Sequence, residues 1–245
     1  MYFVNWQRHV SIANRNGQMV VVKSNKTTKS FHEYLLASTY SLVSIVLGHP
    51  DSPPVVGEMA INNEGSIMRN YLQKLGIRTP RLISLSDSIL VEEYIESGDL
   101  YNAFLEFKEK KIICSLATEA GVMTGILHND GKVFLDNKSQ NYLVGKNYES
   151  LYRTDLAFIQ RKSSVFSRSM DIGTFLASTI DLNKSSYSEI ENAFFQGYFS
   201  VTRQGFPYLS LILRNLLALG FAFNHKSMLK NMLVNSAEKC SIPIR

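Results

Sequence analysis

The pattern of apolar and polar positions predicts short strands at the start of the chain. Three apolar runs fall within the first 23 residues: YFVNW, HVSIA and QMVVVK. Asn16-Gly17 separates the second run from the third, and Asn-Gly between apolar runs is a strong signal of a β-hairpin. We therefore expect a hairpin whose second strand ends near Lys23.

Two helix candidates follow the hairpin. The chain is rich in Ser, Thr and Lys from Ser24, and FHEYLLASTYSLVSIVLG then forms an apolar helix candidate. The Pro-rich HPDSPP should end that helix. In NNEGSIMRNYLQKLG, apolar residues recur at helical spacing, and Gly76 is a typical stop.

A change of pattern near residue 97 divides the chain into two parts. RLISLS and SILVEEYI are short strand candidates, whereas the pattern from Leu100 is mainly helical. We predict an α+β chain with a small strand-rich N-terminal lobe at residues 1–96 and a mainly helical lobe at 97–245. The first lobe carries an insertion at about 24–57.

Length and composition indicate a folded protein. A chain of 245 residues with 45% hydrophobic residues can bury a substantial core. The two cysteines are far apart and form no CxxC or His-containing cluster, so neither a disulfide framework nor a structural zinc site is indicated. The start lacks a signal-peptide layout, and the longest apolar stretches are too short or too polar to cross a bilayer. We expect a cytoplasmic protein without a membrane span.

The net charge of +5 is spread along the chain. No Lys/Arg tract is interleaved with aromatic residues, so no nucleic-acid partner is predicted. A solvated basic surface explains the charge more simply than a polyanion-binding face does. A nucleotide, however, would need only a few of these charges.

The stretch LHNDGKVFLDNKSQNYLV, residues 127–144, is the first candidate for chemistry. Asp136 and Asn141 lie five positions apart on one short polar loop, so a carboxylate and an amide can reach a common point. One group could orient an acceptor hydroxyl while the other binds a divalent cation through oxygen, which suits phosphoryl transfer. On its own, an Asp and an Asn at this spacing are more often part of a turn.

Three further residues make that pattern more informative. Asp155 follows an apolar stretch and could join Asn141 at a magnesium ion, although alone it would be read as a turn or cap residue. Lys23 ends an apolar strand and could hold phosphates, and Glu64, which begins the next strong helix candidate, could fix that lysine by an ion pair. Separately, both would be read as solvated surface charges.

In order and spacing, these residues resemble the protein-kinase-like superfamily. The stretch 127–144 resembles the catalytic loop H-R-D-L-K-x-x-N, which implies that Asp136 is the catalytic aspartate and Lys138 the lysine two positions later. Asn141 would be a metal-binding residue, and TDLA resembles D-F-G, with Asp155 as the main magnesium ligand. The implied cofactors are ATP and Mg²⁺.

The N-terminal motifs extend the resemblance. VVVK resembles V-A-I-K, which makes Lys23 the strand lysine and Glu64 its partner, and ILVEEYIESGDL is similar to a kinase hinge, whose backbone from Glu93 to Ile95 would bind adenine. SMDIGTFLAS and FFQGY resemble segments of the small atypical kinases, namely the RIO type, the KEOPS-complex kinase, lipopolysaccharide kinases and aminoglycoside phosphotransferases. The implied fold is bilobal, with a small antiparallel sheet in the N-lobe and a mainly helical C-lobe.

The departures from the family pattern concern three places. Phe134 and Leu135 replace the polar pair that normally precedes the catalytic aspartate. Gly17 is the only glycine before Lys23, so no glycine-rich phosphate loop exists. About forty residues separate Lys23 from Glu64, and this insertion could supply either extra core packing or a surface for a substrate or protein partner.

The resemblance implies an ATP- and magnesium-dependent phosphotransferase, and it leaves the acceptor open. Lys138 favours a protein-kinase-type loop and hence Ser/Thr residues of a protein, including the chain itself. The C-terminal helices resemble those of small-molecule or glycolipid kinases. A catalytically weak pseudokinase that acts as a nucleotide-binding scaffold is the alternative from another functional class, and a plain α+β binding domain is a third.

Overall fold

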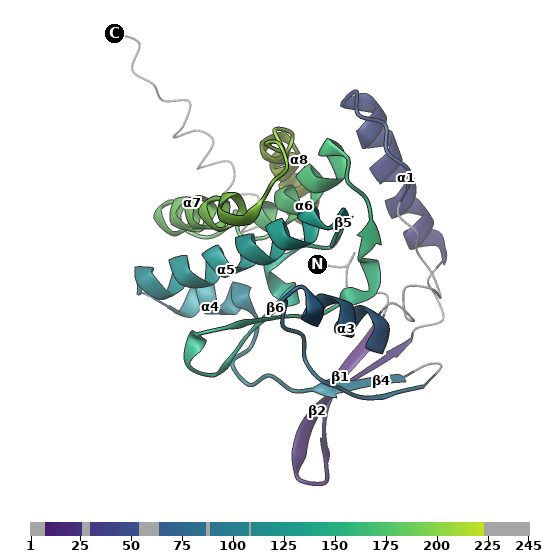
Figure 1. Cartoon of the computed structure of the whole chain (residues 1–245), viewed down its shortest axis with the longest axis vertical. Helices are drawn as coiled ribbons and strands as arrows, with labels where there is room; N and C mark the ends of the chain where they lie inside the picture. The colour runs from purple at the N-terminus through teal and green to yellow at the C-terminus, as the bar shows by residue number, and fades with distance from the viewer. Residues whose placement is uncertain (1–7, 26–29, 54–63, 87–88, 108, 223–245) are drawn as a thin grey trace.

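A computed structural model describes residues 8–25, 30–53, 64–86, 89–107 and 109–222. A small sheet lies at one end of the molecule and a group of helices at the other, with α1 along one side (Figure 1). This arrangement confirms a mixed α+β fold with a small antiparallel sheet. The first predicted strand and residues 223–245 of the predicted helical lobe lie outside the described residues.

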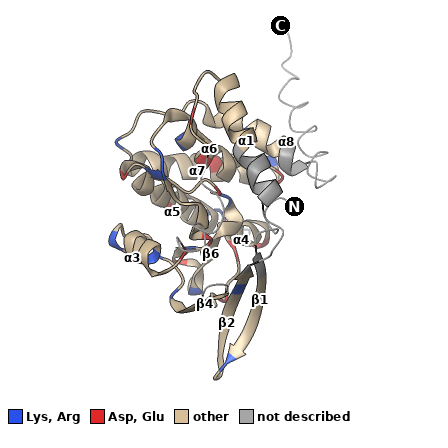
Figure 2. Cartoon of the chain, turned by 90° about the vertical axis from the view of Figure 1, so that its right-hand side faces the viewer, with Lys and Arg blue, Asp and Glu red and all other residues tan. Residues whose placement is uncertain are grey.

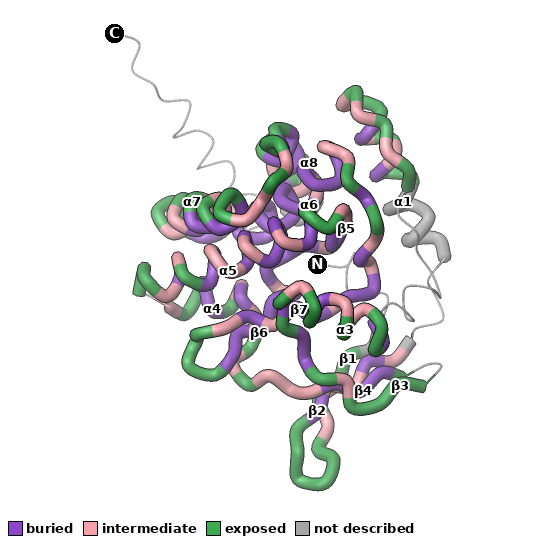
Figure 3. Tube along the Cα trace, viewed as in Figure 1, coloured by how far each residue is buried: buried purple, intermediate pink, exposed green. Residues whose placement is uncertain are grey.

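The N-terminal sheet has four antiparallel strands in the order β1-β2-β4-β3. Their bounds are Arg8–Arg15 (β1), Gln18–Asn25 (β2), Leu82–Leu85 (β3) and Ile89–Glu93 (β4). Asn16 and Gly17 both have positive φ, 52° and 81°, which is the backbone that a two-residue turn between twisted strands requires. The predicted hairpin is therefore confirmed, and its tip is exposed (Figure 3).

The helical part begins after the sheet and continues to the end of the described chain. Its α-helices are α4 (Leu100–Glu106), α5 (Lys110–Asn129), α6 (Val165–Ala177), α7 (Lys184–Val201) and α8 (Ser210–Ala222). Helices α5 and α7 approach closely because Gly121 and Gly197 lie at their contact, where an added Cβ would collide with a main-chain carbonyl of the facing helix.

Short elements between α5 and α6 frame the polar loop. Strand β5 (Lys132–Val133) pairs with β8 (Gln160–Arg161), and β6 (Tyr142–Val144) pairs with β7 (Leu151–Arg153). Three 3₁₀ turns join them: η1 (Ser139–Asn141), η2 (Lys146–Tyr148) and η3 (Leu156–Phe158). Both ends of the loop at 134–141 are thereby tied to buried strands.

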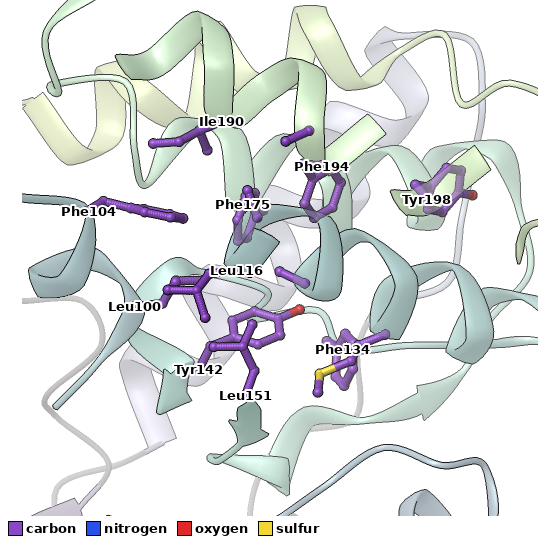
Figure 4. Close-up of a cluster of buried hydrophobic side chains, with 14 of the residues drawn as sticks. Leu100, Phe104, Leu116, Phe134, Tyr142, Leu151, Phe175, Ile190, Phe194 and Tyr198 are labelled. Carbon is purple, nitrogen blue, oxygen red and sulfur yellow. The ribbon is translucent and has the colours of Figure 1, made fainter. Parts of the chain in front are cut away.

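One hydrophobic core spans both parts of the molecule. Helix α3 (Ser66–Lys74) belongs to the N-terminal part, yet Leu72 and the following Ile77 pack into the same cluster as residues of the helical part. Figure 4 shows ten labelled members of this cluster, from Leu100 and Leu116 to Phe194 and Tyr198. The two parts are therefore joined by packing as well as by the chain.

The insertion contributes helix α1 (Ser30–Val46), which agrees with the predicted apolar helix. Tyr40 is buried in a second cluster with Phe166, Leu209 and Leu213 from the helical part. The opposite face is exposed, with Leu42, Ile45 and Val46 among the exposed apolar residues. The insertion thus supplies extra core packing; a substrate or partner surface stays a prediction, and residues 26–29 and 54–57 lie outside the described part.

No described helix is both long enough and apolar enough to cross a bilayer. Basic and acidic residues are distributed over the sheet, α3 and the helical part (Figure 2).

Candidate functional site

Lys23 lies at the centre of a buried polar cluster. Its ammonium group is 2.7 Å from Glu64 Oε1 and 2.8 Å from Glu92 Oε1. It also donates a 2.9 Å hydrogen bond to Thr154 Oγ1. The sequence prediction that Lys23 and Glu64 form an ion pair is therefore confirmed, although Glu64 lies two residues before α3 rather than inside it.

Arg69 of α3 contacts both acidic residues of this cluster. Its Nη2 pairs with Glu92 Oε2, and its Nε donates a 3.1 Å hydrogen bond to the main-chain oxygen of Glu64. A further hydrogen bond joins Nη1 to the carbonyl of Pro80. Because buried charges are costly unless they are paired, this network makes it possible to bury Lys23, Glu64 and Glu92 together.

The charge state of Lys23 follows from its surroundings. Burial by itself would lower the pKa of Lys23, but the neighbouring carboxylates, led by Glu64 and Glu92, raise it well above its ordinary value. Lys23 therefore stays cationic across the physiological pH range. A fixed positive charge at the end of a strand is suited to holding an anionic group.

The polar loop brings Asp136, Lys138 and Asn141 together, as the sequence predicted. Asn141 Nδ2 donates to both Asp136 Oδ2, at 3.0 Å, and the Asp136 main-chain oxygen, at 2.8 Å. Lys138 Nζ is 3.1 Å from the same Oδ2. The side chain of Asp136 is 19% exposed, whereas that of Lys138 is 6% exposed, so the carboxylate is the part that an external molecule can reach.

Arg153, at the end of β7, joins this loop to the segment that carries Asp155. Its guanidinium donates hydrogen bonds of 2.7–2.8 Å to the main-chain oxygens of Asp136, Asn141 and Thr154. The same group lies 4.5 Å from the ring centroid of Phe134, a cation–π distance. The buried arginine thus sets the spacing between the two halves of the candidate site.

Asp171 of α6 supports the loop on its other side. Its carboxylate accepts hydrogen bonds from the main-chain N–H groups of Phe134 and Leu135, and its Oδ2 is 3.1 Å from His128 Nε2. Because the donors are main-chain groups, apolar side chains at 134 and 135 do not remove this support. Leu135 has a φ of 62°, and we infer that the two hydrogen bonds hold this strained backbone in place.

Asp155 follows two residues that contact both halves of the site: Thr154 bonds Lys23, and Arg153 bonds the main-chain oxygens of Asp136 and Asn141. It follows Thr154 directly, has a left-handed backbone with φ of 56° and ψ of 65°, and is the N-cap residue of η3. Burial and the negative charges of Glu64 and Asp136 raise the pKa of Asp155, although nearby lysines oppose that rise. The charges that act on Asp155 thus come from Glu64 and Lys23 and, in the polar loop, from Asp136 and Lys138.

The donor set fits a hard divalent cation better than a transition metal. Within the described ranges, no group of three or more His, Cys, Asp or Glu residues could hold a metal ion. The predicted ligands Asn141 and Asp155 would instead offer two oxygens, and Mg²⁺ often takes only one or two protein ligands beside water and phosphate oxygens. Because the Asn141 amide nitrogen is engaged with Asp136, its Oδ1 is the atom left to coordinate a cation.

The predicted adenine contacts lie at the end of β4. The Glu93 N–H donates a 2.9 Å hydrogen bond to the Arg81 carbonyl, and the Glu93 side chain accepts one from the Arg81 N–H. Of the main-chain groups of Glu93, only the carbonyl could therefore face a ligand. The roles of Glu93 and Ile95 in binding adenine stay predictions.

Residues of the site that were not identified from the sequence include Arg69, Glu92, Arg153 and Thr154. Glu92 had a visible signal, because a carboxylate interrupts the apolar strand run SILVEEYI. Arg153 and Thr154 gave none, since their roles depend on which main-chain and side-chain groups the fold brings beside them.

Comparison with known proteins does not assign the chain to a family. No protein-family model matches the sequence, and no curated protein matches it either. Function must therefore be inferred from the site itself.

Proposed function

We propose that the protein is an ATP- and magnesium-dependent phosphotransferase with an atypical kinase-like, bilobal fold. The observation that carries the proposal is the arrangement around Asp155. A buried Lys23–Glu64 pair lies on one side, 2.9 Å from the hydroxyl of the preceding Thr154, and Asp136 with Asn141 lies on the other. Phosphoryl transfer needs these components in one place: a cation for phosphates, oxygen ligands for magnesium and a carboxylate for the acceptor.

Each residue has a separate role in this proposal. When bound, ATP would supply the γ-phosphoryl group and leave as ADP, and magnesium would neutralise charge on the phosphates. Asp136 orients the acceptor hydroxyl and takes its proton, and Lys138 stabilises negative charge on the transferring group.

Nucleotide binding uses the remaining predicted residues. Asn141 and Asp155 hold magnesium through oxygen, and Lys23 grips the α- and β-phosphates. Glu64 keeps Lys23 in position. The backbone from Glu93 to Ile95 binds adenine.

We propose a Ser or Thr hydroxyl of a protein, including the chain itself, as the acceptor, on the basis of Lys138. This lysine lies beside Asp136 in the structure, at 3.1 Å from its carboxylate. A small-molecule or glycolipid hydroxyl is the alternative acceptor.

A second function, a nucleotide-binding scaffold with little or no transfer activity, is favoured by one observation. Asp136 Oδ2 is already engaged by both Asn141 and Lys138, so an acceptor hydroxyl that uses this oxygen must compete with two partners that are already in place. The two functions differ in transfer and not in binding.

One experiment separates the two functions. Thermal unfolding of the purified chain is followed with and without ATP and magnesium, and transfer of labelled γ-phosphate is then measured to the chain itself and to added acceptors. We expect stabilisation by the nucleotide together with transfer. Asp136→Asn should lower transfer by about 100-fold or more and leave nucleotide binding unchanged, because general-base catalysis contributes that much.

The control is Asp130→Asn, which makes the same chemical change at an exposed carboxylate outside the site. Stabilisation without transfer in the wild type would favour the scaffold. Absence of stabilisation by ATP would contradict both proposed functions and would favour a plain binding domain without a nucleotide site. Full transfer by Asp136→Asn would show that the catalytic assignment is wrong.

A further inference from the structure

Three oxygen atoms of the protein surround the Lys23 ammonium group. The partners are Glu64 Oε1 at 2.7 Å, Glu92 Oε1 at 2.8 Å and Thr154 Oγ1 at 2.9 Å. An ammonium group has three donors and no acceptor, and three oxygens within 2.9 Å match that number. A phosphate oxygen can reach Lys23 only if one of these partners gives up its place.

Glu92 is a partner that can leave Lys23 and still keep a cation beside it. Its side chain is 2% exposed, and its two oxygens are divided between two cations: Oε1 faces Lys23, and Oε2 pairs with Arg69. A carboxylate that leaves Lys23 therefore keeps a cation beside it and is not left buried without a partner. Thr154 also bridges the two groups, because its hydroxyl donates a 3.2 Å hydrogen bond to Glu92 Oε1 while accepting one from Lys23.

We propose that Glu92 competes with the nucleotide phosphates for Lys23 and thereby sets the affinity for ATP. When phosphates bind, Lys23 leaves Glu92 for a phosphate oxygen, and Glu92 stays on Arg69. Before binding, Glu92 keeps Lys23 charged, buried and aimed at the site. The proposal rests on the proposed function, because it requires that Lys23 bind phosphate.

The competition predicts that removal of the Glu92 charge tightens ATP binding. If Glu92 had only a structural role, its removal would not tighten binding. We would titrate the full-length wild type and Glu92→Gln with ATP and magnesium by calorimetry. We expect a Kd for ATP that is about tenfold lower in the variant, since coupling between close, buried charges exceeds the 1.4 kcal/mol that a factor of ten represents. Adenosine, which has no phosphates, should bind both proteins equally.

A matched variant controls for net charge. Glu106→Gln removes the same charge from an exposed position on α4, and its Kd for ATP should equal that of the wild type. If Glu92→Gln does not fold, Glu92→Asp provides the same comparison, because a shorter side chain reaches less far toward Lys23. Failure of the folded variant to bind ATP more tightly than the wild type would overturn the proposal.

A structure of the wild type with magnesium and a non-hydrolysable ATP analogue is the test that needs no variant. We expect Lys23 on a phosphate oxygen and Glu92 on Arg69 alone. A Lys23–Glu92 contact retained beside bound phosphates would overturn the competition while leaving the phosphotransferase proposal intact. Absence of any ATP binding by the wild type would instead contradict the proposed function, and the competition with it.

Discussion

Buried basic residues in this protein are matched by acceptors in more than one element. Lys23 and Arg69 share Glu92, and Arg153 bonds three main-chain oxygens. Burial of a charge costs several kcal/mol unless partners replace the lost water, so each of these residues depends on its neighbours. A change in one partner is therefore expected to affect both stability and the geometry of the site.

Asp171 gives the sharpest prediction for a single residue. In Asp171→Asn, an amide N–H₂ would face one of the two main-chain N–H groups, at Phe134 or Leu135, that now donate to the carboxylate. One buried donor then loses its acceptor, which costs about 1–3 kcal/mol. We expect that loss in the free energy of unfolding, measured with urea, and a lower rate of phosphoryl transfer because the loop before Asp136 is no longer held.

Asp99 provides the matched control for this prediction. Asp99 caps α4 by accepting a hydrogen bond from the Asn102 N–H, and Asn caps helices about as well as Asp. Asp99→Asn should therefore unfold at nearly the same urea concentration as the wild type. Equal stability of Asp171→Asn and the wild type would show that Asp171 is not a support of the loop.

At the scale of elements, local sequence patterns largely predicted which segments form helices and which form strands. They did not predict which elements pack against one another. Asn16-Gly17 specifies its hairpin through neighbouring residues, so the sequence was sufficient there. The docking of α1 depends on hydrogen bonds from Tyr40 and Ser164 to Asp51, and Ser164 lies more than a hundred positions after the other two residues. Periodicity marks an apolar face but does not identify which distant face covers it.

Asp51 joins the insertion to the helical part through hydrogen bonds, and because it is a carboxylate, the stability of this contact depends on pH. Its carboxylate accepts hydrogen bonds from Tyr40, Lys162 and Ser164. Burial would raise the pKa of Asp51, but these hydrogen bonds outweigh it and lower the pKa below the ordinary value of 3.8. Because the folded pKa is depressed, the stabilisation is complete above about pH 3.8 and is lost as the pH falls through the folded value.

Asp51→Asn tests this dependence. An amide cannot pair with the Lys162 ammonium, so we expect the variant to lose about 1–3 kcal/mol of unfolding free energy at pH 7, the cost of unsatisfied buried groups. Urea unfolding of both proteins at pH 7, 5 and 3 should show this difference at the first two values and a smaller one at pH 3. Glu149→Gln, at an exposed carboxylate, should show none of it. An equal difference at all three values would contradict the role of the charged carboxylate.

At the scale of the whole molecule, the order of motifs predicted which residues would meet, and the fold determined how. Lys23 and Glu64 were predicted as a pair and are 2.7 Å apart, and their charges act on Asp155 together with that of Asp136. Glu92 and Arg153 were not predicted, because a buried charge in a strand is read from sequence as a surface charge until its partners are known. The polar supports of a site are therefore less visible in the sequence than the site itself.

The shared core predicts that the two parts of the chain do not fold independently. Leu72 and Ile77, both fully buried, pack from the N-terminal part into the cluster of the helical part, and Lys23 bonds Thr154 across the same boundary. The separate piece 97–245 would expose that apolar surface and should lack cooperative thermal unfolding by circular dichroism. Mixing it with the piece 1–96 should restore the transition, and the intact chain serves as the control. Unfolding of 97–245 alone at the temperature of the intact chain would show that the helical part is an autonomous domain, and that packing of α3 against it adds little stability.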